Sequence, residues 1–359
     1  MQLNILIIGV GLIGGSLGLA LKGSPLVKQV LGLDSDTDSL QKALEIGAID
    51  CSASLAEGVK QADIVFLCTP LRFYPEIIEN IKPFLKPGMI VSDVGSTKQE
   101  VTRILAGLPA GVWGIGGHPM AGAETTGIYG ADRYLFENAV YVLTPGSGIP
   151  EEAVELLSSL LQTTGARVKI MEPALHDEVV AAISHIPHLA AVALVGLTEG
   201  DSQTLMMAAG GFRDTTRIAS SEPALWEDIL FSNREQVLNK LDSLMKRIST
   251  IKMALQLNNH ELVRDELADA KDIRDRIPRL RKGLIPEFCD IVCIVPDKPG
   301  IIGQLGYILG RENVNIVDIE ILRVREGDGG TIRLGVPSSD DANRAVEALQ
   351  KSSIKAWLR

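Results

Sequence analysis

The chain has 359 residues, 46% of them hydrophobic, and a formal net charge of −10 from 45 acidic and 35 basic residues. This length predicts two or three domains with real cores, and the acidic balance argues against nucleic acid or an anionic membrane as a partner. The sequence shows neither a secretion leader nor an uninterrupted apolar run of membrane-spanning length, and Cys51, Cys68, Cys289 and Cys293 lack the spacing of a metal site. We therefore expect a cytoplasmic protein with reduced thiols.

The first third of the chain predicts a dinucleotide-binding fold. Residues 3–8 form an apolar run typical of a buried parallel strand, which leads directly into a glycine-rich turn and a helix. Gly9 makes the turn, Gly11 admits a pyrophosphate at the helix N-terminus, and Gly14 lets the helix pack on the strand. The cofactor-binding residues expected in this turn are Gly9, Gly11, Leu12, Ile13 and Gly14.

An acidic residue completes the fingerprint. A second strand, residues 29–33, ends in Asp34, which lies twenty residues after Gly14 (34 − 14 = 20), where a carboxylate binds the adenosine ribose. Ser35 and Asp36 follow, and no arginine is present there to hold a 2′-phosphate. The pattern favours NAD over NADP.

The alternation of strands and helices continues with apolar runs at residues 63–68, 89–93 and 112–115. Ligands of doubly wound sheets lie at the carboxyl ends of the strands. We therefore expect Asp34, Thr69 with Pro70, Ser96 and His118 to meet at one crevice. Ser96 has an alternative role, because it could cap a helix that starts near Thr97.

His118 lies in the stretch Gly116-Gly117-His118-Pro119-Met120-Ala121-Gly122, which we expect to be a loop. An imidazole has an ordinary pKa of about 6.5 and suits proton transfer near neutrality. A histidine packed in a strained loop would have the same sequence. The neighbouring motifs favour catalysis.

The middle third reads as helical after two closing strands, residues 140–143 and 167–171, which flank a helix at 151–163. Residues 174–188 form a helical pattern in which Pro187 should kink or break the helix. His185 and His188 could suggest a metal, but a third ligand is unclear, and we expect no metal site.

A long helix follows, with apolar residues that recur at spacings of four and three, at Val237, Leu241, Leu244, Ile248, Ile251 and Leu255. Such a seam requires a second helix. The partner could lie within the subunit, but we expect a homodimer interface. The charged tract 261–282 reads as one more amphipathic helix.

The last seventy residues predict a separate module. Strands are expected at 288–295, 314–324, 331–336 and 354–358, and helices from residue 301 and over 340–350. The order βαββαβ is that of a ferredoxin-like unit. It has no cysteine cluster for iron–sulfur and no aromatic pair for RNA, which leaves structural pairing or small-ligand sensing.

Taken together, the motifs resemble those of prephenate dehydrogenases that carry a C-terminal ACT domain, over essentially the whole chain. The matching stretches are Gly9-x-Gly11-Leu12-Ile13-Gly14-Gly15-Ser16, Asp93-x-Gly95-Ser96-x-Lys98, Gly117-His118-Pro119-Met120-x-Gly122, His176-Asp177, Ser184-His185-x-Pro187-His188, Gly210-Gly211-Phe212-Arg213-Asp214-x-Thr216-Arg217, Trp226 and Asp297-Lys298-Pro299-Gly300. Ala123 departs from the family, in which a small hydroxyl residue is common, so one polar contact to substrate is in doubt.

The resemblance implies a Rossmann NAD-binding domain (1–171), a helical substrate and dimerisation domain (172–285) and an ACT domain (287–359). It implies oxidative decarboxylation of prephenate, with His118 as general base and Ser96 orienting it or the hydroxyl. Residues implied to bind substrate are Arg217, His188, Ser184, Gly210 and Glu124, supported by Asp214, Trp226 and Asp177. Arginine suits a carboxylate through its planar fork.

Three other readings remain open at this point. Arogenate could replace prephenate in the same chemistry. A different β-hydroxy-acid dehydrogenase would typically use a catalytic lysine, and Lys169 is the only lysine between residues 160 and 230. A non-catalytic NAD and amino-acid sensor would have no need of the set His118, Ser96 and Arg217.

The C-terminal module suggests regulation. ACT domains pair and hold amino acids at their junction, and the product of such a pathway is L-tyrosine, which we expect as an inhibitor. Asp297 and Gly300 form a turn into a helix N-terminus, which favours a carboxylate. Asn315 and Ile316, opening the next strand, are expected to face the same crevice.

Overall fold

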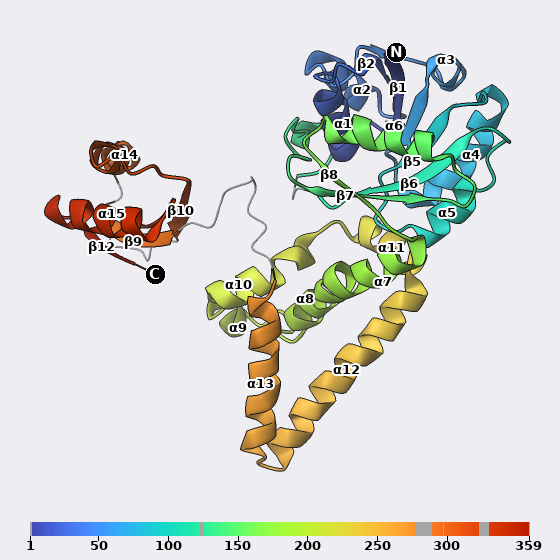
Figure 1. Ribbon diagram of the computed structural model, residues 1–359. Helices are drawn as coiled ribbons and strands as arrows, with labels where there is room; N and C mark the ends of the chain where they lie inside the picture. Colours follow the sequence, from blue (N-terminus) through green and yellow to red (C-terminus); the bar gives the residue numbers. More distant parts are fainter. Residues whose placement is uncertain (1, 123–124, 278–288, 297, 323–329, 359) are drawn as a thin grey trace. The chain divides into compact units, whose positions relative to one another are not determined.

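The computed structural model describes the chain except at residues 1, 123–124, 278–288, 297, 323–329 and 359. The chain folds as two compact units, Met1–Pro278 and Arg279–Arg359 (Figure 1). Each unit is built around its own sheet.

The first unit contains an eight-stranded sheet in the order β3-β2-β1-β4-β5-β6-β7-β8. Its strands are β1 (Leu3–Ile8), β2 (Val27–Leu33), β3 (Cys51–Ser52), β4 (Ile64–Leu67), β5 (Ile90–Asp93), β6 (Trp113–Pro119), β7 (Val140–Pro145) and β8 (Arg167–Ile170). Strands from β3 to β6 pair in parallel, β7 is antiparallel to β6, and β8 is parallel to β7. The strand order reverses beside β1, the switch point at which doubly wound sheets bind ligands.

Both faces of this sheet are covered, which explains its continuous apolar strands. Leu3, Ile5 and Ile7 pack into one core with the helices α1, α2 and α6, whereas Leu6 and Ile8 pack into a second core with α3, α4 and α5. The helical elements are α1 (Leu12–Leu21), α2 (Thr37–Glu45), α3 (Leu55–Gln61), η1 (Leu71–Phe73), α4 (Tyr74–Ile81), η2 (Lys82–Phe84), α5 (Gln99–Leu105), η3 (Ile128–Gly130) and α6 (Glu151–Gln162).

The position of His118 differs from the sequence prediction. The glycine-rich stretch continues strand β6 to Pro119 instead of forming a loop, and His118 pairs with Val142 of β7. Two glycines permit this close pairing: a Cβ at Gly116 would lie 2.4 Å from the Thr144 hydroxyl, and one at Gly117 would lie 2.4 Å from the Asp93 carbonyl. The imidazole is therefore carried by a rigid strand end.

Pro187, which we expected to kink or break its helix, is associated with a local distortion and not with a break. Helix α7 (Pro173–Val180) continues through a π-turn, η4 (Ala181–His185), into α8 (Ile186–Gly196). A proline ring inside an α-helix clashes with the carbonyl four residues earlier. The wider turn, in which Ile186 N–H bonds Ala181 O, accommodates Pro187 and keeps the helix continuous.

The helix Pro173–Gly196 is long and apolar enough to cross a membrane by length and composition, the one such helix among the described residues. It nevertheless carries the buried polar residues His176, Asp177 and His185. Main-chain N–H groups at the start of α5 and the Asn233 amide bond to Asp177, so the face of the helix that carries these polar residues packs against the rest of the unit.

The rest of the helical part ends in a hairpin of α12 and α13 (Figure 1). Its elements are α9 (Ser202–Met206), α10 (Gly210–Thr216), η5 (Arg217–Ser220), α11 (Pro223–Ser232), α12 (Arg234–Gln256) and α13 (His260–Asp275). The Asn259 side chain caps α13 by accepting from Leu262 N–H at 3.0 Å. The expected apolar seam on α12 is only partly covered, since Ile248 is 56% and Leu255 is 62% exposed.

The second unit confirms the βαββαβ order. It consists of β9 (Cys289–Val295), α14 (Ile301–Arg311), β10 (Asp318–Leu322), β11 (Gly330–Val336), α15 (Ser339–Lys351) and β12 (Lys355–Leu358). The antiparallel sheet has the order β10-β11-β9-β12. Strand β10 begins at Asp318, so the predicted strand start at residue 314 was four residues early.

Candidate active site

The glycine-rich turn and the ends of β2 and β4 form a cavity of about 530 Å³. Gly9, Gly11, Asp34, Thr69 and Pro70 line it. Gly9 has a φ of +96°, and a Cβ there would lie 2.8 Å from the Cys68 carbonyl carbon, so only glycine fits. A Cβ at Gly11, the N-cap of α1, would meet nothing within 4 Å, which leaves space for a phosphate at the helix N-terminus.

Three further residues predicted to bind cofactor do not line this cavity. Leu12 and Ile13 are the first residues of α1. Gly14 has the packing role expected from sequence, because a Cβ there would lie 2.0 Å from the Gly9 carbonyl oxygen and 3.0 Å from Ile7. The apolar residues Leu33, Leu55, Phe73 and Ile77 also line the cavity, and no motif in the sequence signals them.

The Asp34 carboxylate is held in place by main-chain donors. One oxygen accepts from Val10 N–H at 2.8 Å, and the other accepts from Asp36 N–H at 2.9 Å. Because both bonds use only part of the carboxylate's acceptor capacity, Asp34 can still accept from ribose hydroxyls. The cavity, the open helix N-terminus and this oriented carboxylate fit NAD.

His118 belongs to a chain of hydrogen bonds that sequence reasoning did not foresee. Its Nδ1 lies 2.8 Å from Nε2 of His176, and Nδ1 of His176 lies 2.8 Å from Oδ1 of Asp177. The residues His176 and Asp177 are buried, with 1% and 0% exposure. The motif His176-Asp177 was noted in the sequence, but nothing there paired it with His118.

These bonds define the tautomer of His118. An ionised carboxylate only accepts, so His176 carries its proton on Nδ1 and its Nε2 is an acceptor. Nδ1 of His118 then donates to that acceptor, and Nε2 of His118 retains a lone pair. Burial, followed by the nearby His176, Lys98 and His185, holds the pKa of His118 well below its ordinary value. His118 is therefore a neutral base with one free nitrogen.

Asp177 also caps helix α5. Its Oδ1 accepts from Lys98 N–H at 2.7 Å, and its Oδ2 accepts from Gln99 N–H at 2.8 Å. The alternative role of Ser96 as the cap of this helix is therefore wrong, because α5 begins at Gln99 and Asp177 takes the cap's place. Ser96 itself lies half-buried in the loop that follows β5.

A stacked pair of rings joins His188 of α8 to Trp226 of α11. The His188 ring lies parallel to the Trp226 indole, with centroids 3.6 Å apart and an interplanar angle of 7°. His185 meets the same indole edge-on at 6.1 Å, and its ring nitrogen lies 3.3 Å from the Asn233 amide. The stack gives His188 and Trp226 a shared, fixed orientation.

The remaining predicted substrate residues occupy different elements. Ser184 lies half-buried in the π-turn, whereas Gly210 and Asp214 of α10 and Arg217 of η5 are exposed. Arg217 and Asp214 each take part in an interaction with another residue. Glu124 and the departing Ala123 lie outside the described residues.

The C-terminal unit has a cavity of about 500 Å³ at the N-terminus of α14. Gly300, the N-cap with a φ of +87°, lines it together with Lys298, Ile321 and Ile332. Asn315 and Ile316 precede β10 and are not among the residues that line this cavity, which reaches β10 at Ile321. Asp297 lies outside the described residues.

Over the described ranges, no group of three histidine, cysteine or acidic side chains could hold a metal ion. The same ranges contain all four cysteines as free thiols.

A dinucleotide turn, an oriented carboxylate beside it and a half-buried, neutral imidazole at the same sheet edge are the features of a dinucleotide-dependent oxidoreductase. Models of the prephenate dehydrogenase nucleotide-binding domain, the prephenate dehydrogenase dimerization domain and the ACT domain match residues 17–170, 172–269 and 290–352. The chain belongs to the prephenate dehydrogenase family of NAD-dependent oxidoreductases.

Individual relatives are similar to this chain over nearly their whole length. A prephenate dehydrogenase of Bacillus subtilis (strain 168) is 39% identical over 98% of this chain and 96% of its own. A crystal structure of prephenate dehydrogenase from A. aeolicus with hydroxyphenyl propionate and NAD+ has a TM-score of 0.72 at 32% identity, over 77% of this chain and 99% of that chain. The crystal structure of Synechocystis arogenate dehydrogenase has a TM-score of 0.66 at 31% identity, over 77% of this chain and 100% of that chain.

Proposed function

We propose that this protein catalyses the NAD-dependent oxidative decarboxylation of prephenate to 4-hydroxyphenylpyruvate in L-tyrosine biosynthesis. The observation that carries the proposal is the chain Asp177–His176–His118, which leaves Nε2 of His118 free to accept a proton. The base lies at the end of β6, at the sheet edge that also carries the cofactor cavity.

Each residue then has a defined task. When bound, NAD supplies the acceptor for the hydride that leaves the hydroxyl carbon of the substrate ring. Nε2 of His118 accepts the hydroxyl proton, and the imidazolium is stabilised through His176 by the Asp177 carboxylate. The ketone that forms lies para to the ring carboxylate, so carbon dioxide leaves and the ring becomes aromatic.

Most of the residues proposed to bind the dianionic substrate lie in the helical part of the first unit, after residue 172. Arg217 is proposed to bind a carboxylate through its guanidinium fork, and Ser96 to orient the hydroxyl or His118. The His188–Trp226 stack is proposed as the flat wall of the substrate site, with Ser184 and Gly210 nearby. Asp34, with no basic neighbour at Ser35 or Asp36, is proposed to favour NAD over NADP.

Arogenate is a second candidate substrate, favoured by the similarity to Synechocystis arogenate dehydrogenase. Steady-state assays that cross prephenate and arogenate with NAD and NADP test the proposal. We expect the prephenate and NAD pair to have the highest kcat/KM. A preference for arogenate would reassign the substrate.

The base is tested by His118→Asn. Loss of a general base typically costs on the order of 10²–10⁴ in rate, so we expect kcat to fall by that factor while NAD binding, followed by fluorescence titration, stays unchanged. A variant that turns over within threefold of the wild type would remove His118 from the mechanism.

We also propose that L-tyrosine inhibits by binding the C-terminal unit. The cavity at the N-terminus of α14 combines a helix N-terminus and Lys298, which favour a carboxylate, with Ile321 and Ile332, which suit an apolar side chain. Truncation after residue 285 should leave an active enzyme that tyrosine no longer inhibits. A truncated enzyme that remains fully tyrosine-sensitive would place the effector in the catalytic site.

A further inference from the structure

Asp93 and Lys98 form an ion pair whose side chains are both completely buried, with Nζ 2.5 Å from Oδ2. Asp93 ends β5, and Lys98 directly precedes α5. Desolvating two charges is costly, and buried pairs can often be replaced by apolar residues without loss of stability. The pair therefore calls for an explanation beyond stability.

Oδ2 of Asp93 also accepts from Gly95 N–H at 2.7 Å, and two further bonds of the pair go to the peptide groups of Gly117. Oδ1 of Asp93 accepts from Gly117 N–H at 2.8 Å, and Nζ of Lys98 donates to Gly117 O at 2.6 Å. The ladder between β5 and β6 ends at Ser92 and Ile115, so these two side chains take the place of a neighbouring strand beyond it. Gly117 directly precedes His118.

Lys98 also bonds to Asp177, the residue at the other end of the hydrogen-bond chain. Its main-chain N–H donates to Oδ1 of Asp177 at 2.7 Å, the same oxygen that bonds Nδ1 of His176. The side chain of Lys98 thus fixes the strand that carries His118, while its main chain fixes the helix that carries His176. One residue sets the separation of the two imidazoles.

We propose that Lys98 and Asp93 are positioning residues that hold His118 in register with His176. The inference rests on the proposed role of His118 as base. Neither side chain lines the cofactor cavity, and both have no solvent exposure. Their removal should therefore lower kcat and leave the KM values for prephenate and NAD nearly unchanged.

Three variants test the proposal: Lys98→Met, the double variant Asp93→Asn/Lys98→Met, and Lys98→Arg. The double variant leaves no unpaired buried charge, and Lys98→Arg retains the charge but moves the donor. The control is Thr164→Val, which removes a buried hydroxyl that donates to Leu161 O at 2.6 Å, in the turn after α6. Each is assayed for kcat, KM and melting temperature.

We expect kcat to fall at least tenfold in all three variants, with both KM values within twofold of the wild type. Thr164→Val should lose stability but keep its kcat. A role limited to stability would instead lower the melting temperature of the Lys98 variants and spare their kcat.

A pH profile adds a readout that stability alone would not move. His118 is faced by His176 and Asp177 from α7, His185 from η4, and the pair Asp93 and Lys98. Removing the Lys98 ammonium deletes a positive charge that opposes protonation of His118. The acid limb of kcat/KM should therefore move to higher pH in Lys98→Met.

A measurement that does not depend on catalysis distinguishes failure of the positioning role from failure of the proposed function. In ¹⁵N spectra of the imidazoles, wild-type His118 should show a proton on Nδ1 alone, and the double variant a mixture of tautomers. Wild-type protein that does not oxidise prephenate would refute the function, whatever the spectra show. An unchanged tautomer, or a kcat within twofold of wild type in a folded double variant or in Lys98→Arg, would overturn the positioning role.

Discussion

At the scale of single residues, the active site depends on which nitrogen of each imidazole carries the proton. Asp177 accepts from Lys98 N–H, Gln99 N–H and His176 Nδ1 at its carboxylate, and from the Asn233 amide at its main-chain carbonyl. This arrangement fixes the tautomer of His176 and, through it, that of His118. The proposed base is thus oriented through two residues, His176 and Asp177, that are themselves buried.

We predict that His176→Gln lowers kcat by about 10- to 100-fold, because the glutamine oxygen can still accept from His118 but no longer links it to the Asp177 carboxylate. Steady-state kinetics between pH 5 and 8 measure the effect. His260→Gln, on an exposed histidine of α13, is the control. Equal profiles for His176→Gln and wild type would contradict the proposed relay.

At the scale of elements, the continuous helix α7–η4–α8 carries His176, His185 and His188 into the interior. The π-turn that accommodates Pro187 also sets the angular position of His188 relative to His176, since a π-turn inserts one extra residue. This is the geometry that lets His188 stack on Trp226. Burial of these imidazoles makes the helix sensitive to acid.

We predict that the stability of the protein falls between pH 6.5 and 4. Burial lowers the pKa of His185 to about 4, below its value in the unfolded chain, so unfolding takes up a proton in this window. The stability is thus fully present above pH 6.5 and lost as the pH falls. One such group contributes up to roughly 3 kcal/mol.

Urea unfolding at pH 7.5 and pH 4.5 measures the effect. His185→Gln should lose less unfolding free energy between the two pH values than the wild type, by about 2 kcal/mol. His260→Gln should behave as the wild type does. The attribution to His185 fails if all three proteins lose the same amount.

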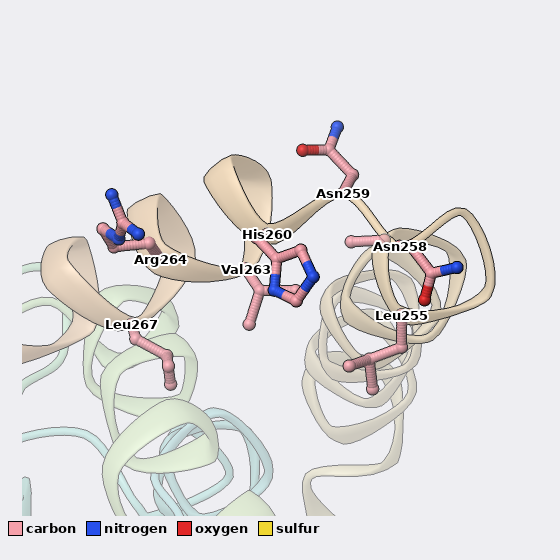
Figure 2. Close-up of a pocket in the computed structure, with 8 residues that line it drawn as sticks. Leu255, Asn258, Asn259, His260, Val263, Arg264 and Leu267 are labelled. Atoms are coloured by element: carbon pink, nitrogen blue, oxygen red, sulfur yellow. The ribbon is translucent and has the colours of Figure 1, made fainter.

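At the scale of the whole molecule, the hairpin of α12 and α13 exposes apolar side chains that other described residues do not cover. Leu255, Val263 and Leu267 line a cavity of about 360 Å³ near its turn, with Asn258, Asn259 and His260 at the bend (Figure 2). Apolar side chains of α12 remain exposed, among them Leu238, Met245 and Ile248. Contiguous apolar surface of this kind marks an interface.

We predict a homodimer that buries this surface. The double variant Ile248→Glu/Leu255→Glu should be monomeric, because two charges would be desolvated at the interface. Light scattering should give the chain mass of 38.6 kDa for the variant and twice that for the wild type. Lys252→Glu adds negative charge to an exposed position of the same helix and should remain a dimer. A wild type that is itself monomeric would refute the prediction.

Much of the architecture follows from local patterns. The apolar strands, the turn at Gly9 and Gly11, the distance from Gly14 to Asp34 and the βαββαβ order are all properties of neighbouring residues, because side-chain period and backbone freedom act over a few positions. The sequence also predicted the sheet edge on which Asp34, Thr69, Ser96 and His118 would lie. The edge follows from the parallel order of the strands.

The tertiary structure alone determined how the base is held. His118 and His176 are 58 positions apart, and Lys98 and Asp177 are 79 apart, so no local periodicity relates them. Local periodicity also does not predict that the strand extends through Gly117, because this extension depends on bonds from Asp93 and Lys98. Nor does it predict the π-turn, which depends on the packing around Pro187. Hydrogen bonds between distant segments form only once the fold has brought their donors and acceptors together, and these bonds convert an ordinary histidine into an oriented base.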